Sequence, residues 1–131
     1  MHMEGFTKKS TMWYDLAIRK QGDGEALSAD VHVPQGSPWF DGHFPGAPVL
    51  PGIAQLGMVF DLIAQASGGP VRVTEVSRVR FRQLILPDDR LVVTAEPRPG
   101  LAGSYAFRIV KGEELVCGGT MVVEAAGPPE L

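Results

Sequence analysis

The sequence has one cysteine and no long apolar run, and both scarcities narrow the class of protein. A single cysteine, Cys117, among 131 residues excludes a disulfide scaffold and favours a reducing compartment. No stretch reaches the roughly 18 apolar residues that a membrane span needs. The first ten residues, MHMEGFTKKS, have no apolar core behind their basic residues, unlike a secretory signal. We therefore expect a soluble, cytoplasmic protein without a membrane segment.

The sequence also has no excess of positively charged residues. The chain has 12 Lys and Arg against 15 Asp and Glu, a net charge of −3, which gives no overall attraction to nucleic acid. No Cys and His spacing suits zinc, so no metal is expected. With 44% hydrophobic residues, a chain of this length can bury about two thirds of its unfolded surface. We expect one domain over residues 1–131, with a flexible segment at 1–10 and a flexible tail at 126–131.

Five segments have the composition of β-strands. Residues 25–34, EALSADVHVP, alternate apolar and polar side chains, the period of a half-buried strand, with His32 on the solvent side. Four more candidates follow, separated by Gly, Pro and Asp, with the spacing of antiparallel neighbours: residues 71–86, 89–99, 104–112 and 113–125.

One helix is predicted between the first strand and the other four. The stretch from Gly52 to Ala66 is apolar on nearly all sides and too long for a typical strand. Pro51 suits the first helical position, and the helix is placed at Ile53–Ala66, before Ser-Gly-Gly-Pro. An apolar helix of this kind should be buried all round. The simplest fold is α+β, an antiparallel sheet that curls around one helix.

Residues 37–52, SPWFDGHFPGAPVLPG, together with the apolar helix, resemble the β-hydroxyacyl-acyl carrier protein dehydratases. The resemblance continues into residues 79–91, VRFRQLILPDDRL, which are similar to the family's strand and its Pro-Gly-Asp turn. It covers residues 26–91. The resemblance implies the hotdog fold and a homodimer with an acyl tunnel between subunits. It also implies loss of water from a 3-hydroxyacyl thioester on the phosphopantetheine of an acyl carrier protein, with no other cofactor.

The resemblance also implies roles for individual residues. Removing the C2 proton places negative charge on the thioester oxygen, so a base and a donor are needed. His43 would be the base, and the amide of Gly52 at the helix start would be the donor. The alternative for His43 is a turn histidine that only bonds a neighbouring carbonyl. Substrate contacts are expected from Phe44, Pro45, Gly46, Pro51, Ile53 and Gly57.

One expected side chain is missing. The family has a glutamate or aspartate at the helix position that matches Gly57. Asp61 lies four residues on and on the same helix face, so it is a candidate acid. Alternatively, Asp61 is a buried acid held by Gln65 or by a partner chain. A second hypothesis is that space over Gly57 admits a wider acyl chain, such as an aryl or polyene thioester, while His43 alone moves the proton.

Two further groups of residues have competing interpretations. Arg78, Arg80 and Arg82 alternate along one predicted strand, so they should share one of its faces. They form either a solvated surface or a basic strip that docks phosphopantetheine phosphate or an acidic carrier protein. Three aromatic residues are expected in the core or an interface rather than at a ligand: Trp13, Tyr14 and Trp39.

Two other functions remain open at this point. A thioesterase of the same fold would use Asp61 to activate water or attack the carbonyl, although such enzymes do not need the HFPG turn. A non-catalytic acyl-binding subunit would explain why Gly57 carries no acid. Acyl chain length, the choice between carrier protein and coenzyme A, and the size of the oligomer are not specified by the sequence.

Overall fold

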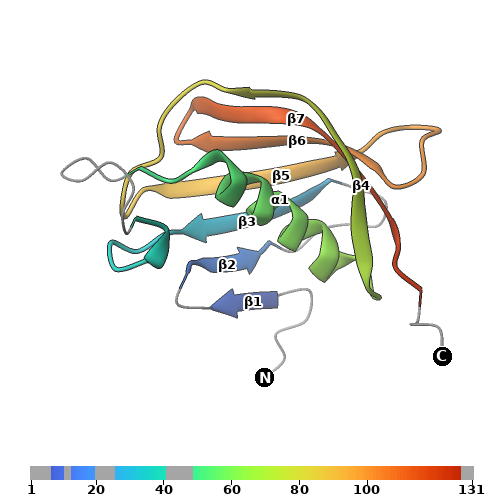
Figure 1. Cartoon of the computed structure of the whole chain (residues 1–131), viewed down its shortest axis with the longest axis horizontal. Coiled ribbons are helices and arrows are strands. Elements are labelled where there is room, and N and C mark those ends of the chain that lie inside the picture. The colour runs from blue at the N-terminus through green and yellow to red at the C-terminus, as the bar shows by residue number, and fades with distance from the viewer. Residues whose placement is uncertain (1–6, 11–12, 20–25, 41–48, 128–131) are drawn as a thin grey trace.

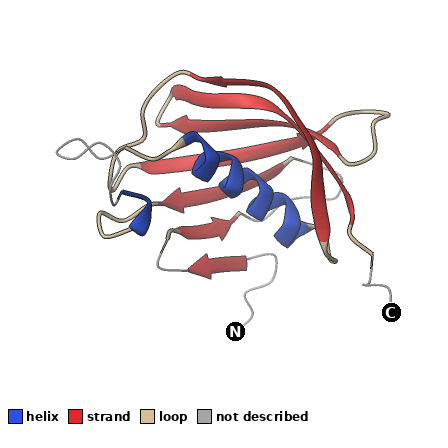
Figure 2. Cartoon of the chain, in the orientation of Figure 1, coloured by secondary structure: helices blue, strands red, loops and turns tan. Residues whose placement is uncertain are grey.

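In the part of the chain that the structure describes, a seven-stranded antiparallel sheet packs against one α-helix (Figures 1 and 2). The computed structural model describes residues 7–10, 13–19, 26–40 and 49–127. The elements are β1 (Thr7–Ser10), β2 (Asp15–Ile18), β3 (Leu27–His32), the short helix η1 (Pro38–Phe40), α1 (Gly52–Ala66), β4 (Val71–Phe81), β5 (Arg90–Pro97), β6 (Ser104–Lys111) and β7 (Glu114–Ala125).

The predicted helix and all five predicted strands are present with closely similar bounds. The helix begins at Gly52 and Pro51 is its N-cap, so proline lies one residue earlier than expected. The strand predicted at 71–86 ends at Phe81. Residues 7–10, expected to be part of a flexible segment, form β1 and pair with β2. Residues 1–6 and 128–131 lie outside the described part of the chain.

The order of the strands differs from a simple meander. β5, β6 and β7 are consecutive neighbours, as the spacing predicted. β4 pairs with β7 instead of β5, and β5 pairs with β3. The order β1-β2-β3-β5-β6-β7-β4 therefore places β4 at the sheet edge. β3, which precedes α1, and β4, which follows it, are therefore separated in the sheet by β5, β6 and β7.

The core lies between α1 and one face of the sheet. Alternate residues of β5 are buried (Leu91, Val93 and Ala95), and so are their partners on β3. The helix contributes its own buried row: Ala54, Gln55, Met58, Val59, Leu62 and Ile63. A strand presents every second side chain to one face, and a helix presents every third or fourth side chain to one face. The buried residues of β3, β5 and α1 therefore point toward one another and pack together.

The expectation that α1 is buried all round is wrong for the single chain. Ile53 is 69% exposed and Gly57 is also exposed. The cause is visible in Figure 1: the sheet covers one side of the helix, and no other element crosses its opposite side among the described residues. An apolar helix therefore keeps an uncovered side.

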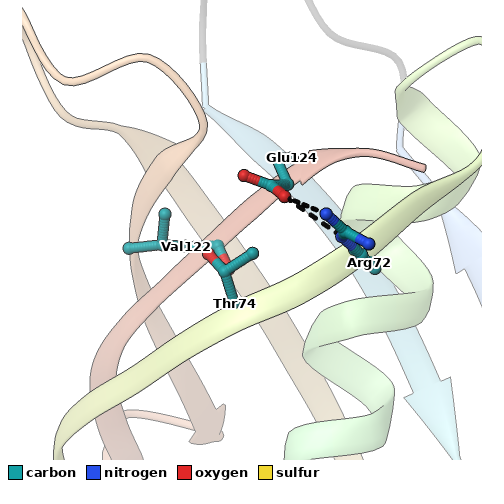
Figure 3. Close-up of polar contacts among 4 residues, drawn as sticks. All are labelled: Arg72, Thr74, Val122 and Glu124. Carbon is teal, nitrogen blue, oxygen red and sulfur yellow. Dashed lines mark hydrogen bonds and ion pairs between the residues drawn. The ribbon is translucent and has the colours of Figure 1, made fainter. Parts of the chain in front are cut away.

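Strand β4 is irregular along the free edge of the sheet. Its start is joined to β7 by the exposed Arg72–Glu124 ion pair and by the hydroxyl of Thr74, which donates to the carbonyl of Val122 (Figure 3). The register shifts between Val73 and Glu75 and again between Ser77 and Arg80. Each shift is a β-bulge, which bends and twists a strand.

The second bulge corrects the prediction for the three arginines. Arg78 lies inside it with φ 58°, a left-handed conformation that is uncommon for a residue with a side chain. Regular alternation is therefore interrupted at Arg78, and the three arginines do not form one regular row. Arg80 pairs with Gly118 after the bulge, and Arg82 follows the end of the strand. All three side chains are exposed.

Candidate functional site

The first turn of α1 presents backbone donors that its cap does not use. Pro51 has extended φ and ψ of −68° and 154° and makes no side-chain cap hydrogen bond. Its carbonyl accepts from the amides of Ala54 and Gln55 at 3.1 and 3.3 Å. The amides of Gly52 and Ile53 precede this bonded turn, and a helix N-terminus carries partial positive charge. The site can therefore stabilise an anionic oxygen.

A neighbouring ring leaves little room for a side chain at the helix start. A Cβ placed on Gly52 would lie 2.8 Å from Cζ of Phe81, closer than side-chain carbons approach other atoms. Phe81 is 51% exposed, so its ring covers this end of the helix and also faces solvent. The aromatic ring of Phe81 therefore occupies space beside the amide that was predicted to act as the donor.

A hydrogen bond joins the two halves of the sequence motif. The amide of Leu50 donates to the carbonyl of Ile85 at 2.8 Å, and both side chains are buried. The segment after β4 is fixed in turn by the amide of Arg82, which donates to the carbonyl of Val116 at 2.7 Å. The chain before α1 and the chain after β4 therefore lie side by side at the helix start.

An aromatic pocket opens beside Gly57. Its volume is about 280 Å³. The rings of Trp13 and Trp39 lie 5.0 Å apart between centroids and are tilted by 56°. Apart from the adjacent residues and the helix's own backbone, no atom of the described residues lies within 4 Å of the position that a Cβ on Gly57 would occupy. The pocket is lined by Trp13, Tyr14, Trp39, Ala54, Gly57, Phe60 and Asp61.

Asp61 lies in the wall of the same pocket and is half-buried. It follows Gly57 by four residues, which is about 6 Å along the helix axis. Nε2 of Gln65 is buried and has no hydrogen-bond partner, so within the described structure Gln65 does not donate to the Asp61 carboxylate through that atom. A carboxylate beside an aromatic pocket is an arrangement that suits acid chemistry.

A second cavity lies on the opposite, outer face of the sheet. Its volume is about 600 Å³, and its polar lining residues are Asp15, Asp30, His32 and Arg90. His32, which we expected to face solvent, is partly covered there, with a quarter of its side chain exposed. No group of three or more metal-ligating side chains occurs among the described residues. No helix in that part of the chain is long and apolar enough to span a membrane.

The structure brings together part of the predicted site. Pro51, Gly52 and Ile53 form the helix start, while Gly57 and Asp61 line the aromatic pocket. The remaining motif residues lie outside the described residues: His43, Phe44, Pro45 and Gly46. Sequence reasoning missed that Trp13, Tyr14, Trp39 and Phe60 share a pocket with Gly57. The only available signal was the position of Trp39 four residues before His43.

Comparisons with known proteins agree with this geometry. The family model ApeI-like, described as ApeI dehydratase, matches residues 19–120. FabZ of Syntrophomonas wolfei subsp. wolfei, a 3-hydroxyacyl-acyl-carrier-protein dehydratase, is 34% identical over 105 residues, 73% of each chain. The dehydratase heterocomplex ApeI:P of Xenorhabdus doucetiae matches with TM-score 0.70 at 20% identity, over 79% of this chain and 90% of that one. A mutant of the thioesterase PA1618 of Pseudomonas aeruginosa matches with TM-score 0.59 at 19% identity, over 84% and 81%. The predicted hotdog fold is confirmed.

Proposed function

The chain belongs to the ApeI-like dehydratase family, and from this premise we propose that it dehydrates a 3-hydroxyacyl thioester carried on an acyl carrier protein. The product is the trans-2-enoyl thioester. The observation that carries the proposal is the start of α1, where the Pro51 cap gives no side-chain hydrogen bond to the amides of Gly52 and Ile53, and five residues separate Gly52 from the HFPG motif in the sequence. The fold alone does not separate a dehydratase from a thioesterase, because a thioesterase shares it.

The reaction needs a base that removes a proton and a backbone amide that stabilises the negative charge on the thioester oxygen. His43 takes the C2 proton, and the electron pair moves toward the thioester carbonyl. The amide of Gly52 donates to the oxygen as it becomes negative, an interaction that strengthens in the transition state. The C3–O bond then breaks, the hydroxyl leaves as water after gaining a proton, and the carbonyl re-forms.

The proton for the leaving hydroxyl has two candidate sources. Asp61 lines the pocket beside Gly57, so its carboxyl group can reach the site directly or through a bridging water. Otherwise His43 returns the proton that it took. An Asp61→Asn variant separates the two sources: a fall in kcat of about 10²-fold or more assigns the acid to Asp61, and an unchanged kcat assigns it to His43.

The aromatic pocket favours a wide, flat acyl chain. Space at Gly57 is open, and the indole rings of Trp13 and Trp39 form walls on which a conjugated chain can stack. Substrate contacts are also assigned to Phe44, Pro45, Gly46, Pro51 and Ile53. Comparing kcat/KM for aryl or polyene chains with that for saturated chains of equal length tests this assignment, and a preference for saturated chains would contradict it.

The active unit is a homodimer or a larger homo-oligomer. β4 is an edge strand with free backbone groups, and uncovered apolar side chains gather on it and next to it. They are Ile53, Val73, Val76, Phe81, Leu84 and Leu86. Sedimentation analysis tests the assembly: Val76→Lys should shift the protein toward monomer, and a monomeric wild-type chain would contradict it.

The arginines beside β4 are assigned to carrier-protein docking. Arg80 and Arg82 are exposed close to the site entrance, since Phe81 between them covers Gly52. Guanidinium groups pair well with phosphate and carboxylate. Replacing Arg80 and Arg82 by Gln should weaken carrier-protein affinity and reduce its salt dependence. An affinity that is unchanged at low and high salt would contradict the assignment.

No metal or further cofactor is assigned to the reaction, and the setting is the cytoplasm. The decisive experiment is mass spectrometry of 3-hydroxyacyl carrier protein after incubation with the chain. Loss of one water supports dehydration. Release of the free acid indicates a thioesterase, and an unchanged acyl group indicates a binding subunit. A His43→Ala variant is the control, because loss of water must stop in it if His43 is the base.

A further inference from the structure

The turn between β4 and β5 contains a strained aspartate. The amide of Asp89 donates to the carbonyl of Leu86 at 3.1 Å, which closes a four-residue turn with Pro87 in second place. Asp88, in third place, has φ 68°. A turn of this type favours glycine there. Aspartate tolerates the left-handed conformation better than most residues, but at a cost that glycine does not have, so the contacts of the Asp88 side chain matter.

The side chain of Asp88 contacts a histidine on the outer face of the sheet. Its Oδ1 lies 3.1 Å from Nε2 of His32 on β3. The amide of Asp88 donates to the carbonyl of Val33 at 2.9 Å, so main chain and side chain bind the same strand. Two other charged groups face His32: Oδ2 of Asp15 on β2 lies 4.0 Å from Nδ1, and Arg90 is the cross-strand partner on β5.

The same turn supports the start of the helix. Oδ2 of Asp89 accepts from the amide of Leu86 at 2.8 Å and from Nζ of Lys111 at 3.2 Å. One residue earlier, the carbonyl of Ile85 accepts from the amide of Leu50, two residues before Gly52. The contact between His32 and Asp88 therefore lies at one end of a short chain of bonds, and the helix start lies at the other.

From this chain of bonds we infer that His32 and Asp88 are a positioning pair that fixes the N-terminus of α1 for the reaction. Neither side chain touches the aromatic pocket or the helix start. They act through the turn, which holds Ile85 against Leu50. The inference rests on the proposed function, because it matters for rate only if the amide of Gly52 acts on the substrate. Strain at Asp88 is retained because glycine there would remove the contact.

Kinetics of matched variants test the pair. Asp88→Gly relieves the backbone and removes the contact, and it should lower kcat about 3- to 10-fold with KM within about twofold, because a misplaced transition-state donor affects kcat. Asp88→Asn keeps a hydrogen-bonding side chain and should restore most of kcat. His32→Val should lower kcat as much as Asp88→Gly, and the double variant no further. Asp30→Asn, on the same sheet face but paired with Arg19, is the control and should leave kcat unchanged.

A second measurement does not depend on activity. Hydrogen exchange at the Leu50 amide should be at least about tenfold faster in Asp88→Gly than in wild type, because its bond to Ile85 loosens. Unchanged exchange, or a kcat that falls in neither single variant, overturns the inference. If the wild-type chain dehydrates no thioester, the proposed function fails, and the exchange measurement alone then decides whether the pair positions the helix start.

Discussion

Replacing Gly57 by glutamate is the sharpest test of the site. Beyond the adjacent residues and the helix backbone, a Cβ at this position meets no atom within 4 Å in the described part of the chain, so the side chain enters open space beside the aromatic pocket. Glycine inside a helix costs about 0.5 to 1 kcal/mol relative to better helix formers. Repulsion with Asp61, four residues on, offsets about 0.2 to 0.5 kcal/mol of that gain. The variant should be as stable as wild type or more stable by up to about 0.8 kcal/mol, which corresponds to a rise in Tm of up to about 3 °C.

The effect on activity depends on what the open space is for. If dehydration of plain 3-hydroxyacyl chains lacks only an acid, Gly57→Glu should raise their kcat by about 10²- to 10⁴-fold. Wide chains should lose kcat/KM, because the new side chain fills part of a pocket of about 280 Å³. Formation of the enoyl thioester, followed by mass spectrometry for both substrate types, measures each effect.

Two control variants separate shape from chemistry. Gly57→Gln has nearly the shape of glutamate without its acid, and Gly57→Ala changes only the helix propensity. The reasoning about the acid is refuted if the Gln and Glu variants have the same kcat on plain chains. The reasoning about the pocket is refuted if wide and plain chains respond equally in all three variants.

Three further changes have defined outcomes. Gly52→Ala should displace the Phe81 ring and lower the free energy of unfolding, measured by denaturant titration, by about 1 kcal/mol. It should also lower kcat. Adding Phe81→Ala to this variant should recover the stability. Burial raises the pKa of Cys117 to about 11 from 9.0. As the pH rises, the thiol ionises in the unfolded chain before it does so in the folded chain. The free energy of unfolding should therefore fall by up to about 2.7 kcal/mol between about pH 9 and 11, and the fall should be smaller in Cys117→Val. Arg72→Ala should cost under about 1 kcal/mol in the same titration, because its ion pair with Glu124 is exposed.

Local pattern was sufficient to predict α1 and five of the strands, but it missed β1 and β2. The alternation around residues 27–32 and the apolar run from Gly52 to Ala66 each specify a conformation through side-chain period alone. The turn at Pro87 was also visible, because proline fixes its own φ. The helix start could be assigned a role because the motif beside it resembles a known family.

Long-range arrangement could not be predicted in the same way. Trp13 and Trp39 are far apart in sequence, and nothing in either neighbourhood indicates that their rings meet. The pairing of β4 with β7 depends on the path that the chain takes across the whole sheet. The bulges of β4 lie where apolar residues are three positions apart instead of two, at Val73, Val76 and Val79, and this break in the period marks an irregularity without giving its geometry. Only coordinates place such features.

The two bulges of β4 have a consequence for how selective its free edge is. A uniform strand presents evenly spaced amides and carbonyls and accepts almost any extended peptide, which leads toward fibres. On β4, breaks after Val73 and after Ser77 interrupt that spacing twice within eleven residues. A visiting strand can match every group only if it bends at the same two places. The edge of β4 can therefore pair with a strand that has the same two bends, but it is a poor template for the repeated strand addition that builds fibrils.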